Sequence, residues 1–230
     1  MKDLRDCLVK NKIFFGKPKS TDYISNSGLS EIKRVLLNGP PFLGDEIHLH
    51  FGSEVHRRFL LYKKSKFKFS AEQESDIRGM IEALDNDPFV SKLVDSAVFE
   101  KEYIRKVEGV NLKVILDIKG VGKMKGIGAD LKTTSCATQQ AFVKTAIEKY
   151  DYLRQGKLYK EAEKLHSFYF IGIQKRKPYK VFIMDVADYA KEEQAAWEEA
   201  KFLIEFFKQF GRPFVEGSSN SKRKKRRAGT

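Results

Sequence analysis

The sequence has little cysteine and no long apolar run. Two cysteines, Cys7 and Cys136, stand among 230 residues, too few for a disulfide framework, a structural zinc site or an iron–sulfur cluster. No segment approaches the ~18 consecutive apolar residues of a membrane-spanning helix, and the first residues lack the apolar centre of a signal peptide. We therefore expect a cytoplasmic protein with no membrane segment.

Acidic residues are in the minority, and the formal net charge is +13. A basic run near the C-terminus supplies six of these charges and leaves +7 on the rest of the chain: Lys222, Arg223, Lys224, Lys225, Arg226 and Arg227. Basic charge of this size favours a polyanionic partner, because it speeds encounter and releases counterions from phosphates. Charge alone leaves open a lysine-rich surface with no such partner.

Hydrophobic periodicity predicts an alternation of helices and strands. A first short helix over 29–37 could be capped by Ser27 or Asn26. Helices are then expected at 52–64, 71–87, 88–96, 137–150, 151–165 and 188–210, and strands at 97–106, 112–120, 126–134, 166–174 and 179–187.

This order predicts an α/β fold in which helices flank a mixed central β-sheet. We expect one domain over residues 1–216 and, from its composition, a disordered basic tail over 217–230. The last helix carries Trp197, Phe202, Phe206, Phe207 and Phe210 at helical spacing. This aromatic stripe is interpreted as core or as a contact between subunits.

The stretch GIGADLKTTS, residues 126–135, places an acid and a base on one face of a strand. Side chains two residues apart on a strand point the same way, so Asp130 and Lys132 project together while Leu131 turns towards the core. Asp117 ends an apolar strand upstream and can converge on them if the two strands pair. Two carboxylates suit a divalent cation such as Mg²⁺. The alternative is an ordinary ion pair on an edge strand.

These motifs resemble the PD-(D/E)xK nuclease superfamily, and in particular its RecB-like branch and the RecE-type exonucleases of phages and prophages. Asp117 is followed thirteen residues later by Asp130-x-Lys132 in the wording DLKTT, and the next helices carry Gln155-x-x-x-Tyr159. YISNSGLSEIK and FGSEVHRRFL extend the similarity over residues 22–160. Leu116 stands where the strict motif has proline. The resemblance implies the PD-(D/E)xK nuclease core.

The resemblance also implies a role for each motif residue. The metal ligands would be His56, Asp117, Asp130 and the backbone carbonyl of Leu131, holding Mg²⁺, for which Mn²⁺ could substitute. Lys132 would position the attacking water. An additional acid is expected on the preceding strand, where Glu100 and Glu102 are both available and Glu102 is preferred for its central position.

Further residues are candidates for supporting the chemistry and for contacting DNA. Gln155 and Tyr159 share a helix face and would orient Lys132, although a packed polar pair is the alternative. Candidate phosphate contacts, which could equally be a solvated helix face and ordinary strand residues, are Arg57, Arg58, Thr133 and Thr134.

Taken together, the resemblance implies a Mg²⁺-dependent deoxyribonuclease, an exonuclease that degrades linear duplex DNA with 5′ to 3′ polarity. It would support phage-type single-strand annealing recombination. A homo-oligomer and a single-strand annealing partner are expected with it. The alternatives are a structure- or site-specific endonuclease on the same core and a DNA-binding module without catalysis. No helix-turn-helix pattern supports sequence-specific recognition.

Overall fold

A computed structural model of the chain describes residues 13–16, 18–19, 21–37, 46–63 and 66–215. Its main sheet has the strand order β2-β4-β5-β6-β7, and β3 pairs with β4. These strands are β2 (Tyr23–Ile24), β3 (Ala97–Val107), β4 (Val110–Gly120), β5 (Ile127–Thr134), β6 (Ser167–Gln174) and β7 (Val181–Asp185). Because β2 is parallel to β4 and β5 to β6 while the other pairs are antiparallel, the sheet is mixed, as the sequence predicts.

The edge of β4 that faces away from β3 is divided between two other strands. β2 pairs with residues 111–112, and β5 pairs with residues 118–119. Between these points, residues 113–117 have no strand partner on that edge among the described residues. The sheet therefore splits along the middle of β4, and Asp117 lies at the end of the split.

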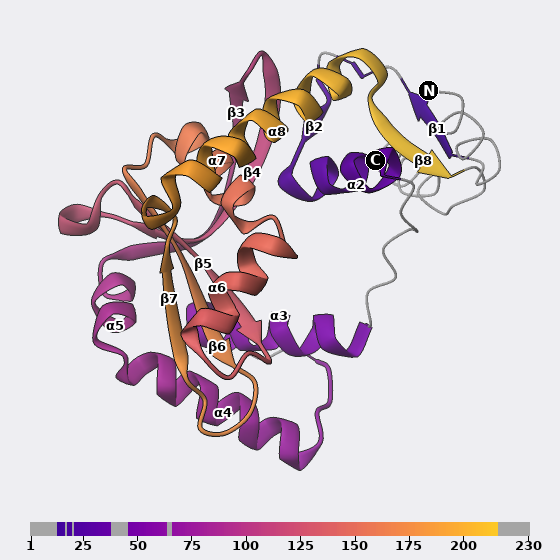
Figure 1. Ribbon diagram of the computed structural model, residues 1–230. Helices are drawn as coiled ribbons and strands as arrows, with labels where there is room; N and C mark the ends of the chain where they lie inside the picture. Colours follow the sequence, from indigo (N-terminus) through magenta and orange to yellow (C-terminus); the bar gives the residue numbers. More distant parts are fainter. Residues whose placement is uncertain (1–12, 17, 20, 38–45, 64–65, 216–230) are drawn as a thin grey trace, which may run out of the picture.

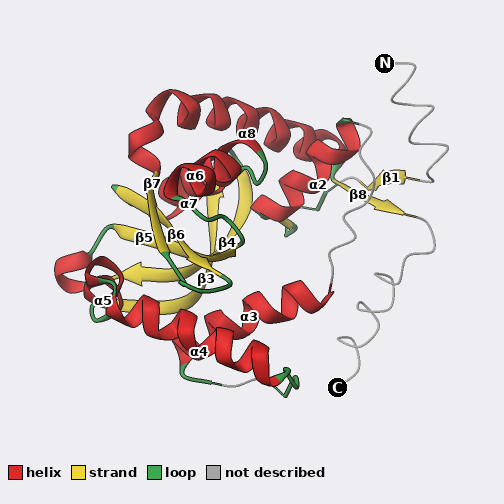
Figure 2. Cartoon of the chain, turned by 60° about the horizontal axis from the view of Figure 1, so that its bottom comes forward, coloured by secondary structure: helices red, strands yellow, loops and turns green. Residues whose placement is uncertain are grey.

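Helices cover both faces of the sheet (Figures 1 and 2). One face carries α3 (Glu46–Leu61), α4 (Ala71–Asn86) and α5 (Pro88–Val94), and the other carries α2 (Asn26–Leu36), α6 (Gln139–Glu148), α7 (Tyr152–Glu163) and α8 (Ala190–Phe210). Each face has its own hydrophobic core. Adjacent residues of β6 show this division, since Phe170 joins the α7–α8 core and Ile171 joins the α3–α4 core.

The N-terminal part differs from the sequence prediction in two local features. Helix α2 is capped by Ser25, whose side chain accepts a hydrogen bond from the backbone N–H of Gly28; the predicted caps, Asn26 and Ser27, lie inside the helix. Helix α3 begins at Glu46, upstream of the predicted start at Gly52. Gly52 lies within this helix where it approaches β5, and an added Cβ there would lie 3.2 Å from Thr133 Oγ1.

A small second sheet joins β1 (Ile13–Gly16) to β8 (Arg212–Val215) in antiparallel pairing. No local pattern predicted it, because the pairing connects the two ends of the described chain. The residues of the aromatic stripe on α8 differ in burial. Phe207 is buried, Phe206 packs edge-to-face on Phe15, and Phe202 and Phe210 are exposed. In the described part of the chain, no helix has the length and apolar character needed to span a membrane.

Candidate active site

The split in the sheet gives Asp117 a neighbour on β5. The backbone N–H of Leu131 donates a 2.9 Å hydrogen bond to Asp117 Oδ2, in the region where the ladder between β4 and β5 has ended at the Ile118–Ala129 pair. The Asp117 carboxylate thus accepts the hydrogen bond that a backbone carbonyl of a neighbouring strand would otherwise accept from Leu131. This contact fixes Asp117 next to the Asp130–Lys132 segment, as the sequence predicts from strand pairing.

Asp130 and Lys132 lie together on the same face of β5. The Lys132 ammonium is in ion-pair contact with Asp130 Oδ2, and Gln155 of α7 donates a 2.7 Å hydrogen bond to Asp130 Oδ1. Asp130 and Gln155 are both buried. Helix α7 therefore fixes the carboxylate from behind while Lys132 covers its other oxygen.

His56 reaches the same point from α3. Its Nδ1 lies 3.3 Å from Asp117 Oδ2, and a hydrogen bond links the imidazole to the backbone of Leu131. Burial lowers the pKa of His56 to about 4, against the opposing effect of the Asp130 charge. The imidazole is therefore neutral at pH 7, which is the form that binds a metal.

Burial and neighbouring charges shift the pKa values of Asp117 and Lys132. Burial, followed by the charge of Asp130, raises the pKa of Asp117 well above its ordinary value. Burial lowers the pKa of Lys132, but the charges of Asp130 and Asp117 outweigh it and the net pKa is raised. Lys132 is thus held as a cation between two acids that repel each other.

This donor set fits a divalent cation. Asp130 Oδ2 is buried, and among the described residues no donor meets it at hydrogen-bonding geometry, although the Lys132 ammonium is in contact. Hard carboxylate and carbonyl oxygens are the donors that Mg²⁺ prefers, and a neutral imidazole also suits Mn²⁺. The described residues contain no group of three His, Cys, Asp or Glu side chains already disposed about one point. Occupation would therefore require small side-chain movements.

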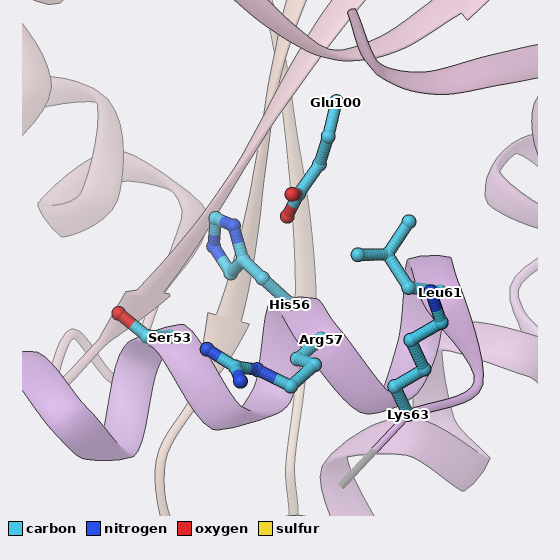
Figure 3. A pocket seen from close by; sticks show the side chains of 6 residues that line it. All are labelled: Ser53, His56, Arg57, Leu61, Lys63 and Glu100. Atoms are coloured by element: carbon cyan, nitrogen blue, oxygen red, sulfur yellow. The ribbon is translucent and has the colours of Figure 1, made fainter. Parts of the chain in front are cut away.

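The strand register distinguishes the two candidate acids on β3. Partners in the β3–β4 ladder run from Phe99–Ile118 to Lys101–Leu116, so Glu100 stands directly opposite Asp117. Glu100 has a positive φ of 47°, and Figure 3 shows its carboxylate directed towards His56. The preferred candidate, Glu102, stands opposite Ile115 and pairs with Lys113 at 2.6 Å. Of the two acids that the sequence left open, the geometry favours Glu100 over Glu102.

A cavity of about 340 Å³ adjoins His56 and Glu100 (Figure 3). Arg57 and Lys63 line it, and Arg57 is exposed. Arg58 is different, because its guanidinium binds Glu54 at 2.6 Å and Glu74 through two hydrogen bonds. Arg58 therefore ties α3 to α4, and its predicted contact with phosphate would compete with these two glutamates. Arg57 stays a candidate.

On the other side of Lys132, a second cavity of about 460 Å³ extends towards α2 and is lined by Gln155 and Tyr159. Tyr159 is buried edge-to-face against Phe168, and burial raises its pKa to about 12, with a further contribution from the Asp130 charge. Tyr159 thus lies next to Gln155 at the rear of the site. Thr133 and Thr134 continue β5 beyond Lys132, each partly buried.

Tyr152 is part of the site but was not among the predicted residues. The Lys132 ammonium lies 5.4 Å from the centre of its ring, and the ring also stacks on Phe170. The signal available in the sequence is its position three residues before Gln155, which places both on one face of a helix.

Comparisons with known proteins agree with this architecture. The family described as a PDDEXK-like domain of unknown function (DUF3799) matches residues 38–209. A predicted exonuclease from Eubacterium rectale is 16% identical, with a TM-score of 0.59 over 88% of this chain and 87% of that one. At this identity the likeness concerns the fold.

Two further solved structures resemble the chain less closely, with lower TM-scores. An alkaline exonuclease from Laribacter hongkongensis is 13% identical, with a TM-score of 0.37 over 89% of this chain and 96% of that one. A phage-related exonuclease from Haemophilus somnus is 13% identical, with a TM-score of 0.35 over 87% and 94% of the two chains. No curated protein matches the chain.

Proposed function

Since the chain belongs to the PDDEXK-like family that matches residues 38–209, we propose that it is a metal-dependent nuclease that degrades linear duplex DNA from an end. The observation that carries this proposal is the convergence of two acids and a lysine, Asp117, Asp130 and Lys132, at the split in the sheet. The exonuclease name of the Eubacterium rectale structure supports cleavage from an end.

In this proposal each residue has a defined task at the scissile phosphate. Asp117, Asp130, His56 and the Leu131 carbonyl would hold the ion, and Glu100 is placed to assist. A bound divalent cation polarises a phosphoryl oxygen and lowers the pKa of water. Lys132 positions the attacking water and offsets the negative charge that develops on the phosphate. Gln155 keeps Asp130 in its orientation through the 2.7 Å hydrogen bond.

Further features are proposed from the resemblance to the RecE-type exonucleases. They are Mg²⁺ as the ion with Mn²⁺ as a substitute, 5′ to 3′ polarity, a homo-oligomer that admits a DNA end, and a single-strand annealing partner. One nuclease domain over residues 1–216 belongs to the same proposal. The tail at 217–230 lies outside the described residues.

The exonuclease and the endonuclease differ in their need for a DNA end. The test incubates the protein with end-labelled linear duplex and with covalently closed circles of the same sequence, with and without Mg²⁺. We expect Mg²⁺-dependent loss of the linear duplex and intact circles, because the sequence shows no helix-turn-helix pattern that could direct internal cutting. Prompt conversion of circles into discrete linear fragments would instead identify an endonuclease.

A further inference from the structure

A third cavity, of about 300 Å³, lies beyond the end of β5 and has no role in the chemistry above. Its walls come from the residues that follow Lys132, from α6, and from the junction between α6 and α7. The residues used below are Thr133, Thr134, Lys149, Tyr150, Tyr152 and Lys175. This volume is at the small end of the range for ligand sites, which suits one nucleotide.

The aromatic wall of this cavity connects the surface to the active site. Tyr150 is 48% exposed and stacks on Tyr152 with ring centres 5.5 Å apart at 23°. Tyr152 stacks in turn on Phe170 at 4.6 Å and carries the Lys132 ammonium over its ring. The Lys149 ammonium lies 5.3 Å from the centre of the outermost ring, Tyr150. This ring offers a platform for an unpaired base when the ammonium turns from the ring towards a phosphate.

Two ammonium groups stand over the same cavity without acidic partners. Among the described residues, no carboxylate forms an ion pair with Lys149 or Lys175, and no acid lines the cavity. Burial lowers the pKa of Lys175. An anion bound here would offset that cost, and the hydroxyl groups of Thr133 and Thr134 lie on the side towards Lys132.

We propose that this cavity is a subsite for one nucleotide of a single DNA strand, whose base stacks on Tyr150 and whose phosphate lies between Lys149 and Lys175. Rings that stack on bases, combined with basic groups along the backbone, are the general means of binding single strands without regard to sequence. The inference rests on the proposed nuclease function. It adds that a strand separated at the active site is held by its first unpaired nucleotide.

The test measures binding of a fluorescent oligothymidylate in EDTA, where no cleavage occurs, by fluorescence anisotropy. Tyr150→Ala should weaken binding about tenfold, within the range for one stacked base. Tyr150→Phe keeps the ring and should bind like the natural protein. Replacing Lys149 and Lys175 by Ala should reduce the log–log salt slope by up to about 1.4, at about 0.7 for each lysine. Lys144→Ala, on the exposed face of α6, is the matched control and should change neither quantity.

Unchanged binding by Tyr150→Ala would overturn the subsite. Competition by free thymidine monophosphate as strong as that by the oligothymidylate would also overturn it, because the cavity would then bind free nucleotides. Asp130→Asn separates this inference from the proposed function. If Asp130→Asn still cleaves duplex DNA while Tyr150→Ala loses binding, the nuclease site is misassigned and the subsite stands. If Asp130→Asn is inactive while Tyr150→Ala binds normally, only the subsite fails.

Discussion

At the scale of single residues, the raised pKa of Asp117 makes the stability of the protein depend on pH. Burial and the nearby Asp130 raise its pKa, so the folded state binds this proton more tightly than the unfolded chain does. The free energy of unfolding must therefore fall as the pH rises from the ordinary carboxyl pKa through the raised one. In the metal-free protein at pH 7, Asp117 destabilises the fold.

Asp117→Asn should consequently raise the melting temperature of the metal-free protein at pH 7. The expected gain is on the order of 1 kcal/mol, or roughly 2–4 °C for a chain of this size, since Asn can still accept the Leu131 hydrogen bond. The fall in stability between pH 4 and pH 7 should become shallower. Glu82→Gln, on the exposed face of α4, is the control and should leave the pH dependence unchanged. A lower melting temperature for Asp117→Asn would contradict the account of its pKa.

Lys132 is the second residue with a distinct expectation. Lys132→Ala should lower the cleavage rate about 100-fold or more, the scale for losing one preorganised electrostatic group, while DNA binding in EDTA is retained. Lys144→Ala on α6 provides the comparison, since it removes an equal charge far from the acids. A near-normal cleavage rate for Lys132→Ala would show that Lys132 only forms an ion pair with Asp130 and has no role in cleavage.

At the scale of elements, α2 is joined to α7 and α8 by a buried charge network. Arg154, only 1% exposed, donates to Asn26 Oδ1 at 3.0 Å and to Glu199 at 2.5 Å, and also contacts Ser30 and Asp151. Removing one partner from such a network leaves buried polar groups without compensation. The network thereby fixes the N-terminus of α2 beside the cavity that contains Gln155.

Arg154→Met should therefore cost about 3 kcal/mol or more of unfolding free energy, the scale for breaking a buried ion pair. Lys201→Ala, which removes an exposed i,i+3 pair with Glu198 on α8, should cost about 0.5 kcal/mol or less. Urea denaturation monitored by circular dichroism compares the two. Equal losses would show that the buried network contributes no more than a surface pair.

The elements also show how far the sequence can predict the structure. Alternation along Val114, Leu116 and Ile118 predicts β4, and the distance from Asp117 to Asp130 predicts their meeting. Glu100 could not be preferred over Glu102, because the choice depends on the register that the two-residue turn at Glu108–Gly109 imposes. Long-range contacts, such as the β1–β8 pair and the contact of Lys132 with Tyr152, have no local signal.

For the whole molecule, the distribution of basic charge predicts how DNA binding depends on salt. Deleting residues 218–230 removes six basic groups, and the log–log salt slope should change by up to about 5, at roughly 0.9 for each phosphate neutralised. The cleavage chemistry should be unaffected, because the site is formed by β4, β5, α3 and α7. Binding measured over a range of salt concentrations makes the comparison. An unchanged slope would show that the tail makes no phosphate contacts.

The central claim is that the acids and the lysine at the split in the sheet form a metal-dependent nuclease site. The most direct measurement follows cleavage of end-labelled linear duplex DNA in Mg²⁺ by the natural protein and by Asp130→Asn, with EDTA as the metal-free reference. Asn has nearly the same volume as Asp and keeps an acceptor for Gln155, so the fold should be unchanged by circular dichroism. The account predicts Mg²⁺-dependent cleavage by the natural protein and none by Asp130→Asn. Substantial cleavage by folded Asp130→Asn in saturating Mg²⁺ would contradict it.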